Sequence, residues 1–220
     1  MTNYTRIRAI QERLAKVVLE LDELLDAVER PAFNPTPLFE LARTMAKKLS
    51  QTQVDSINAI LSQMQDAPVQ HVAYVLATAW HEARFSPQRE WGRGKGRRYG
   101  VKGRHGQVPY GRGLVQITWD RNYEWLDRVA SAAGLTKPGD VLRDFDLALR
   151  PDIAVLALVK GMLNGAFASN GKSLAHYGPD TSGRFDYVNA RQTVNILDKA
   201  EQIAGYARRF ETALKAGGWA

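Results

Sequence analysis

The chain has 220 residues, no cysteine and a formal net charge of +7, with 45% hydrophobic and 24% charged residues. This length and balance are typical of a soluble protein with one sizeable core and an appendage. The absence of cysteine excludes disulfides, thiolate metal sites and a cysteine nucleophile. No apolar run approaches the roughly 18 to 20 residues that cross a bilayer, and the N-terminal segment has no signal-peptide pattern. We therefore expect a protein that stays in the cytoplasm unless another protein releases it.

The positive charge is concentrated in residues 84–112. This segment carries nine Lys and Arg residues against one acid, Glu90, so its net charge is +8 and the rest of the chain sums to −1 (+7 minus +8). The nine are Arg84, Arg89, Arg93, Lys95, Arg97, Arg98, Lys102, Arg104 and Arg112. Such a patch favours an anionic partner, whether nucleic acid, anionic lipid or an acidic polymer. A solvated loop that only keeps the protein soluble would have the same composition.

Residues 5–29 have the pattern of one amphipathic helix. Apolar residues recur at spacings of three and four, with charged residues between them; they are Ile7, Ile10, Leu14, Val17, Leu21, Leu24 and Val28. The pattern fits a short coiled coil and a helix docked on the main domain equally well. A segment that disturbs an outer membrane is disfavoured, because strong membrane binders have a dominantly basic polar face.

Three prolines in residues 30–37 break this helix and predict a linker. We therefore expect an N-terminal helix and linker over residues 1–37 and a main domain over residues 38–220. Helical periodicity predicts elements over residues 37–49, 50–65 (with Ser50 as N-cap), 67–85, 115–135, 138–167 and 185–217. Residues 91–113 follow neither the helical nor the strand period, and residues 169–184 are polar and glycine-rich. The fold is expected to be mainly α, with irregular structure at its centre.

Glu82 is a candidate for acid chemistry. It follows Val75 by seven residues and Ala79 by three, so it lies on or beside the apolar stripe of the most apolar helix, in its last turn. Burial and the negative end of the helix dipole both disfavour the charged form of a carboxyl group there, as a general acid requires. An ion pair with Arg84 or another arginine would instead keep the carboxylate charged.

Glu90 has the opposite setting. It follows Pro87 in the arginine-rich segment, where positive charge keeps a carboxylate ionised and able to act as a base. Two carboxyl groups in opposed environments are the arrangement used in glycoside hydrolysis, and inverting enzymes separate them by about 6.5 to 9.5 Å to admit a water. A surface salt bridge to Arg89 or Arg93 is the alternative interpretation.

Aromatic residues that could stack on sugar rings cluster in the same region: Trp80, Trp91, Tyr99, Tyr110, Trp119, Tyr123 and Trp125. Of these, Trp80 and Trp125 have helical spacing and are expected in the core. Other chemistries fit less well. The His81-Glu82 pair lacks the second histidine of the zinc-protease motif, the four histidines have no ligand spacing, and the GRGKG stretch lacks the Ser or Thr of a phosphate loop.

The stretch YGRGLVQITWDRNY, residues 110–123, resembles the signature of the family 19 chitinases and their bacteriophage endolysin relatives. That signature is YGRG, then Gln and Ser or Thr, then Asn-Tyr. The resemblance extends upstream to residues 81–82 and downstream to residues 186–214. It covers roughly residues 38–216, and the N-terminal helix lies outside it. It implies a lysozyme-like helical domain of two lobes with a central cleft.

The resemblance also implies roles for individual residues. Glu82 matches the general acid of the family, Glu90 matches by order the base that activates water, and Thr118 matches the hydroxyl residue that helps to hold this water. Substrate-positioning roles fall on Tyr110, Gln116, Asn122, Asn195 and, less closely, Arg208. The chain departs from the chitinases after His-Glu, where it has Ala83 and Arg84 instead of the usual Thr or Ser. This departure weakens the case for chitin.

Peptidoglycan is the expected substrate, because no secretion signal or disulfide is present and a basic patch suits a polymer whose stem peptides carry carboxylates. We expect an endolysin that cleaves β-1,4 glycosidic bonds by an inverting mechanism without metal or organic cofactor. It would be made in the host cytoplasm and reach the periplasmic wall with the help of a holin-like protein, without nucleic acid or a transmembrane segment. It would be a monomer or self-associate weakly through the N-terminal helix.

Three alternatives remain open from the sequence. A chitinase would use the same pair of carboxylates on a related polymer. A nucleic-acid-binding module would use the basic, glycine-rich segment with its interleaved aromatic residues. A virion scaffold without catalytic activity would assemble through residues 5–29.

Overall fold

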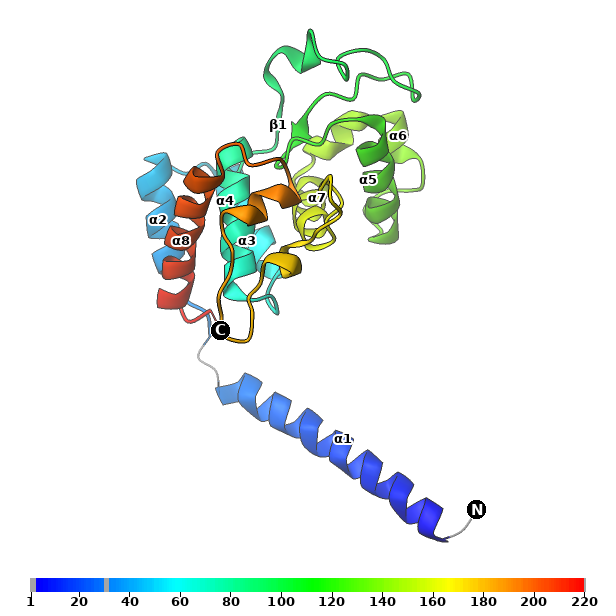
Figure 1. Cartoon of the computed structure of the whole chain (residues 1–220), viewed down its shortest axis with the longest axis vertical. Coiled ribbons are helices and arrows are strands. Elements are labelled where there is room, and N and C mark those ends of the chain that lie inside the picture. The colour runs from blue at the N-terminus through cyan, green and yellow to red at the C-terminus, as the bar shows by residue number, and fades with distance from the viewer. Residues whose placement is uncertain (1–2, 30–31, 220) are drawn as a thin grey trace. The chain divides into compact units, whose positions relative to one another are not determined.

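The computed structural model describes residues 3–29 and 32–219 of the chain. The chain separates into two units, residues 1–34 and residues 35–220. Helices dominate both units, and the strands of the described residues are two residues long (Figure 1). The predicted mainly α fold is therefore confirmed. Residues 30 and 31 of the predicted linker lie outside the described residues.

The first unit contains one helix, α1 (Asn3–Glu29). It covers the whole of the amphipathic pattern predicted from residue 5 onward. The apolar side chains of Ile7, Ile10, Leu14, Val17 and Leu21 are 49 to 58% exposed. Neither α1 nor any other helix among the described residues is both long and apolar enough to span a bilayer.

The second unit is built around α4 (Val69–Ala83). Twelve of its fifteen residues are buried, because its sequence is apolar on all sides and such a helix needs cover all round. Helix α8 (Ala200–Ala216) packs along it, and α2 (Thr36–Ala46) packs on α8. Helices α3 (Gln51–Gln63) and α7 (Pro151–Leu163) pack against each other and against α4. The core therefore lies between helices that are far apart in sequence (Figure 1).

Local signals account for where several helices begin. The backbone N–H of Gln53 donates to the Ser50 hydroxyl at 3.3 Å, and the Ser50 N–H donates to the Gln53 side chain at 2.8 Å. This is the reciprocal capping box, so the predicted Ser50 cap is confirmed. Pro151 stands at the first position of α7, where its missing N–H and fixed φ suit a helix start.

A second group of elements surrounds the basic segment. Strand β1 (Gln88–Arg89) pairs antiparallel with β2 (Arg112–Gly113), so the long loop between them leaves and returns at one point. That loop contains the short 3-10 helix η1 (Trp91–Gly94) and rises above α5 (Asp120–Ala132) and α6 (Asp140–Arg143) in Figure 1. Apart from η1, residues 91–111 contain no regular element, as their lack of helical or strand period predicts.

Two predicted helices are wrong in extent. Residues 115–119 are not helical, because Arg112 bridges back to Ile117 and the chain turns at Gln116 and Trp119, both with positive φ (53° and 71°). The predicted helix over residues 138–167 is divided into α6, the 3-10 helix η2 (Phe145–Leu149) and α7, since Pro151 starts a new helix.

The helical element predicted over residues 185–217 also begins too early in the chain. Residues 185–199 contain only the 3-10 helix η4 (Asn189–Thr193), and a continuous α-helix begins at Ala200 as α8. The side chain of Asp186 accepts the backbone N–H of Asn189 at 3.0 Å. This local bond competes with regular helix formation, as short polar side chains commonly do.

Candidate active site

Glu82 lies in the last turn of α4, as its sequence position predicts. The helix ends there because Arg84 and Phe85 both have positive φ (50° and 59°), and the Phe85 N–H donates to the carbonyl of Ala79 at 3.2 Å. This closure is of the Schellman type. It leaves the Glu82 carboxylate half-buried at the end of an otherwise buried helix, with 19% of the side chain exposed.

The partner of Glu82 is Arg191, in η4. Arg191 Nη1 donates to Glu82 Oε1 at 2.8 Å, and its Nε donates to the carbonyl of Asp198 at 3.0 Å. The Arg191 side chain is only 2% exposed, so its guanidinium and the Glu82 carboxylate hold each other in a fixed geometry. The ion pair with another arginine, which was the alternative to the general-acid interpretation, is therefore present. Arg84, the nearer candidate from the sequence, instead stacks over the Trp80 ring with its guanidinium carbon 4.4 Å from the ring centre.

Sequence reasoning missed Arg191 because nothing in its spacing points to Glu82. The only signal is that it is the single charged residue in residues 187–197. A lone cation in an uncharged and partly buried stretch needs an anionic partner. That partner cannot be named without the fold.

The ring of His81, next to Glu82, does not add positive charge to the site at neutral pH. Burial lowers the pKa of His81, and the nearby Glu82 carboxylate only partly opposes this, while Arg191 and Arg84 act in the same direction as burial. The cationic group beside Glu82 is therefore Arg191.

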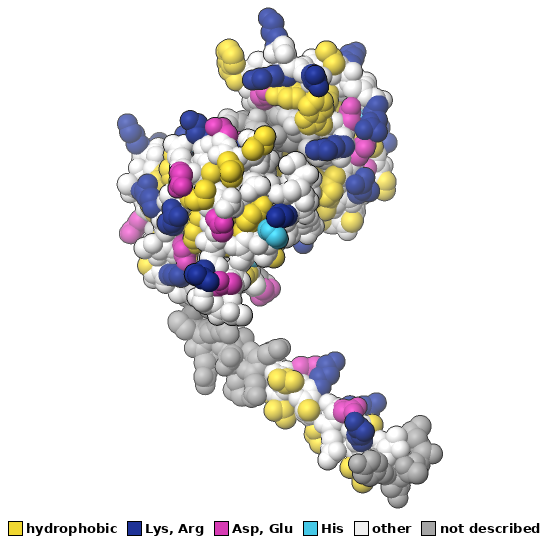
Figure 2. All heavy atoms as spheres, viewed as in Figure 1, with side chains coloured by type: hydrophobic (Ala, Val, Ile, Leu, Met, Phe, Trp, Pro, Cys, Tyr) yellow, Lys and Arg dark blue, Asp and Glu magenta, His cyan; other side chains and the backbone are white. Residues whose placement is uncertain are grey.

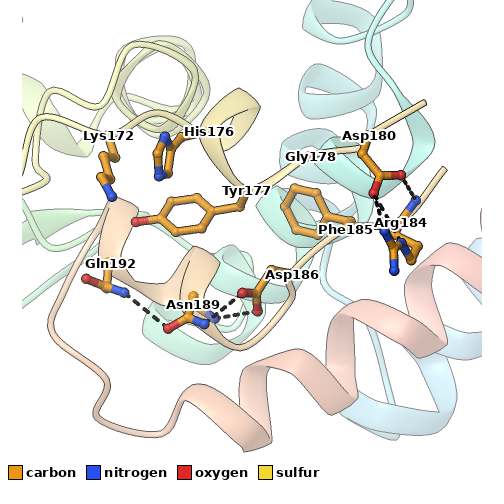
Figure 3. Close-up of a pocket in the computed structure, with 10 residues that line it drawn as sticks. All are labelled: Lys172, His176, Tyr177, Gly178, Asp180, Arg184, Phe185, Asp186, Asn189 and Gln192. Carbon is orange, nitrogen blue, oxygen red and sulfur yellow. Dashed lines mark hydrogen bonds and ion pairs between the residues drawn. The ribbon is translucent and has the colours of Figure 1, made fainter. Parts of the chain in front are cut away.

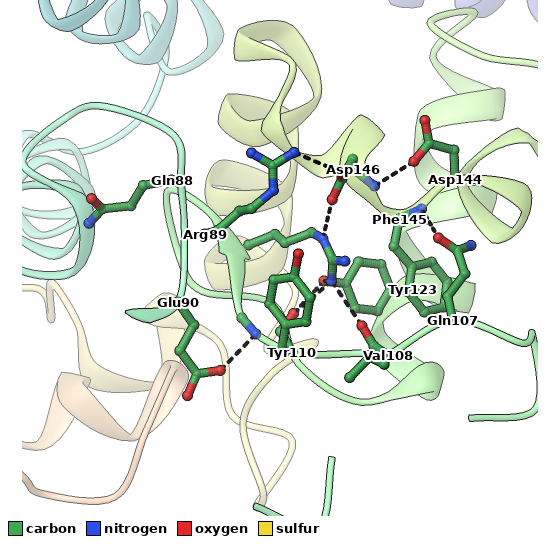
Figure 4. A network of polar contacts seen from close by, with 12 residues as sticks. Gln88, Arg89, Glu90, Gln107, Val108, Tyr110, Tyr123, Asp144, Phe145 and Asp146 are labelled. Atoms are coloured by element: carbon green, nitrogen blue, oxygen red, sulfur yellow. Dashed lines mark hydrogen bonds and ion pairs between the residues drawn. The ribbon is translucent and has the colours of Figure 1, made fainter. Parts of the chain in front are cut away.

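Glu90 lies directly after β1, in the second group of elements. Its Oε1 accepts the Tyr99 hydroxyl at 2.8 Å and its Oε2 accepts the Gly111 N–H at 3.0 Å, while its own N–H donates to the Gly111 carbonyl at 2.7 Å. Both oxygens are thus held in position, and Figure 4 shows the Glu90 side chain with one of these two bonds. Burial and the bond to Glu90 raise the pKa of Tyr99, so its hydroxyl stays a donor at neutral pH. Arg89 pairs with Asp146 rather than with Glu90.

The residues of the predicted signature form a tight loop after β2. The Gln116 side chain folds back, and its Nε2 donates to the carbonyls of Gln88 at 3.1 Å and Gly113 at 3.2 Å. Gln88 in turn donates from its side chain to the backbone carbonyl of Glu82 at 3.2 Å. Gln116 is thereby connected through Gln88 to the end of α4.

Thr118 lies just before α5, and Asn122 lies in the first turn of that helix. The Asn122 side chain donates to the Thr118 carbonyl at 2.8 Å, which fixes both residues. Together with Gln116 they line a small pocket of about 170 Å³. The other side of this pocket includes Val194, which is close in sequence to Arg191, and Phe167. The pocket therefore brings three of the predicted site residues together with the segment that holds Glu82.

The other predicted substrate contacts have different settings. Tyr110 is buried, and the Arg112 guanidinium covers its ring at 3.5 Å. Asn195 is exposed, and its side-chain oxygen accepts the Ile196 N–H at 2.8 Å. Arg208 is exposed on α8, with its guanidinium 5.5 Å from the centre of the Tyr187 ring. None of these three lines the pocket formed by Gln116 and its neighbours.

An ion network in which only Arg112 is buried supports the loop that carries Glu90. Asp146, in η2, accepts Arg89 Nη2 and Arg112 Nε, each at 2.6 Å, and Arg112 Nη1 also donates to the Tyr110 carbonyl at 3.1 Å (Figure 4). Burial acts to raise the pKa of Asp146, but the hydrogen bonds from the two arginines outweigh it and hold the pKa below its usual value. Both strands of the small sheet are thus tied to η2.

A larger hollow of about 630 Å³ lies along residues 172–192. Its lining is polar and of mixed charge (Figure 3): Lys172, His176, Tyr177, Asp180, Arg184, Asp186, Asn189 and Gln192, with Gly178 and Phe185. Asn189 and Gln192 flank Arg191 in η4, so this hollow adjoins the segment that holds Glu82. Within residues 3–29 and 32–219, no three His, Asp or Glu side chains gather in a way that could hold a metal ion.

Comparison with known proteins adds no identification. No protein-family model matches the chain, and no curated protein and no solved structure matches it. The functional argument therefore rests on the motifs of the sequence and the geometry of the site.

Proposed function

We propose that this chain is an endolysin, a glycosidase that cleaves the β-1,4 bonds of peptidoglycan, with a lysozyme-like fold of the family 19 chitinase type. The observation that carries the proposal is the position of Glu82. It is held by Arg191 at the end of a buried helix, and the segment with Arg191 also borders the pocket of Gln116, Thr118 and Asn122. The motif in residues 110–123 begins more than twenty-five residues after Glu82 in the sequence. It nevertheless lies beside the segment with Arg191, which holds Glu82.

In the proposed mechanism, the Glu82 carboxylate first takes up a proton from the solvent and then donates it to the glycosidic oxygen. Glu90 accepts a proton from the water that attacks the opposite face of the sugar, and the Thr118 hydroxyl orients this water. An ionised carboxylate accepts about four hydrogen bonds. Glu90 uses two of these for Tyr99 and Gly111, so it keeps acceptor capacity for the water. The reaction is a single displacement and inverts the anomeric centre.

The loop between the two strands supports an anionic polymer as substrate. Its six Lys and Arg side chains, at positions 93, 95, 97, 98, 102 and 104, are all exposed, and Trp91 is 98% exposed. Figure 2 shows Lys and Arg side chains over the part of the second unit that this loop forms in Figure 1. Stem-peptide carboxylates of peptidoglycan complement this charge, whereas chitin offers none. The enzyme would act on the periplasmic wall once a holin-like protein has permeabilised the membrane.

The test is the release of reducing ends from purified Gram-negative peptidoglycan, with colloidal chitin in parallel. We expect release mainly from peptidoglycan. Glu82→Gln should abolish it, because the amide cannot donate the proton, and should lower the unfolding midpoint without preventing folding, because the buried Arg191 guanidinium loses its counter-charge. Glu40→Gln, on the exposed face of α2, makes the same chemical change away from the site and should keep full activity.

Release mainly from chitin would replace the proposal by the chitinase alternative. Full activity of Glu82→Gln would remove Glu82 from the mechanism. No release from either polymer, with a folded protein, would contradict the glycosidase proposal itself.

A further inference from the structure

The apolar face of α1 has a strict seven-residue repeat. With Ile7 as position a, the a positions are Ile7, Leu14, Leu21 and Val28, and the d positions are Ile10, Val17 and Leu24. All seven are apolar, and α1 is helical across them. Val18 and Leu25 at position e widen the stripe in the second half of α1. The apolar a and d positions still recur over three heptads, which is the repeat of a coiled coil and fits another helix as partner.

The charges beside the seam point to a second copy in antiparallel orientation. Position g is occupied by Arg6, Arg13, Glu20 and Ala27, and the two central residues, Arg13 and Glu20, have opposite charges. In a parallel pair, g faces position e of the other helix five residues on, so Arg13 would face Val18 and Glu20 would face Leu25, with no charge pair. In an antiparallel pair, g faces g. If Leu14 of one copy lies opposite Val17 of the other, Arg13 faces Glu20, and symmetry forms this pair twice.

The seam residues agree with the same alignment. Parallel dimers favour β-branched residues at a and Leu at d, but here d holds Ile10 and Val17. In the antiparallel alignment, the numbers of facing a and d residues sum to 31. The apolar layers are then Ile7 with Leu24, Ile10 with Leu21, and Leu14 with Val17, each formed twice, while Val28 faces Asn3. Every one of these layers combines one β-branched residue with one leucine, so side-chain volume is even along the seam.

We propose that α1 pairs with α1 of a second copy of this chain as an antiparallel two-stranded coiled coil, which makes the protein a dimer. The proposal rests on the repeat and on charge complementarity, and it is independent of the proposed enzymatic function. The dimer carries two copies of the second unit, so it can engage a polymer at two points, which raises avidity without any new contact.

The first test is sedimentation equilibrium of the full chain, whose monomer mass is 24.6 kDa. The parent chain should sediment at twice this mass. Glu20→Arg places Arg13 opposite a second arginine, and Arg13→Glu places Glu20 opposite a second glutamate, so each variant alone should dimerise at least tenfold more weakly. Mixing the two variants should restore dimers, because each seam edge then pairs arginine with glutamate. The control Glu12→Arg has the same charge change at position f, outside the seam, and should dimerise like the parent.

The second test fixes the orientation, and the absence of native cysteine makes it simple. Full-length Ile10→Cys and Leu21→Cys chains, distinguished by a tag on one of them, are mixed and oxidised. The antiparallel alignment brings these positions together, so the mixed disulfide should dominate. Disulfides within each variant would overturn the orientation. A monomer at every concentration would overturn the dimer, and a trimer or tetramer would overturn the two-stranded pairing.

Discussion

Glu82 Oε1 and Arg191 Nη1 are 2.8 Å apart although 109 positions separate the two residues in the chain. The bond joins the end of α4 to η4 and fixes the direction of a half-buried carboxylate. Residues of η4 also line the large polar hollow, and η4 is followed directly by Val194, which lines the small pocket. A displacement of Arg191 would therefore change the lining of both the large hollow and the small pocket.

Replacing Arg191 by methionine should destabilise the protein. The change leaves the half-buried Glu82 carboxylate and the Asp198 carbonyl without their donor. Breaking a buried ion pair from one side costs about 3 to 5 kcal/mol, and we expect the lower end because Glu82 is partly exposed. Urea denaturation measures the free energy of unfolding.

The matched control for this measurement is Arg128→Met on the exposed side of α5, which should change the free energy of unfolding by no more than about 0.5 kcal/mol. Arg191→Lys keeps the charge but cannot reproduce the two directed bonds, so it should fall between the parent and Arg191→Met. An Arg191→Met variant as stable as the control would show that the ion pair contributes nothing to stability.

Gly111→Ala should reduce glycosidase activity more than stability. A methyl group there would lie 2.8 Å from Gln116 Oε1 and 3.2 Å from Glu90 Cβ. Both side chains are partly exposed and can move, so folding should survive, but the carboxylate of Glu90 would leave its position. A misplacement of about 1 Å can cost on the order of 100-fold in rate, and we expect at least about tenfold in kcat. Reducing-end release and thermal unfolding on one preparation separate the two effects, and unchanged kcat would contradict the role given to Glu90.

The parts of the fold that depend on neighbouring residues could be predicted from the sequence. Ser50 caps α3 through a partner three residues away, and the continuous apolar composition of α4 is enough to predict burial. The position of Glu82 in the last turn of α4 followed from its spacing on the apolar stripe. Arg191 could not be found in this way, because its partner lies on a different element.

The turn at residues 115–119 shows a second limit of sequence reasoning. These residues were predicted to form the first turn of a helix, but Gln116 has a φ of 53°, and its side chain is held by carbonyls on Gln88 and Gly113. The bond to Gln88 crosses from another segment of the chain, so local propensity gives no sign of it. Tertiary contacts override the helical pattern at the place where the candidate site is formed.

The stability of the protein should fall as the pH decreases below about 6.5, partly because of His71. This side chain is 6% exposed, with Nε2 2.6 Å from the Gly178 carbonyl and its ring against Phe185. Burial lowers the pKa of His71, and the carbonyl only partly opposes this. The unfolded chain, where the pKa is about 6.5, therefore binds the proton more tightly, and the free energy of unfolding decreases as the pH falls below that value.

The measurement compares urea midpoints at pH 7.5 and pH 5.0 for the parent and His71→Gln. Glutamine cannot gain a proton, so the variant should lose less stability between the two pH values, even if its packing makes it less stable at both. Carboxylates with a lowered pKa, such as Asp146, contribute to the pH dependence only at lower pH. Equal losses for the two proteins would exclude His71 as a source of the pH dependence.

Two helical glycines should respond in opposite directions to alanine. Gly205, in α8, has a helical φ and no atom within 4 Å of an added methyl group. Gly205→Ala should raise the free energy of unfolding by about 0.5 to 1 kcal/mol, because alanine loses less backbone entropy in a helix. Gly161, in α7, has Phe167 Cε2 only 2.0 Å from the methyl position. Gly161→Ala should lower stability by about 1 to 3 kcal/mol through overpacking.

The same pair of variants tests the wall of the small pocket. Phe167 lines that pocket opposite Gln116 and packs edge-on against Trp125 at 5.1 Å between ring centres. The methyl group of Gly161→Ala pushes this ring away, so KM for peptidoglycan should rise, while Gly205→Ala leaves KM unchanged. A Gly161→Ala variant with the parent KM but reduced stability would place the substrate elsewhere on the surface, and the larger hollow along residues 172–192 would then be the next region to substitute.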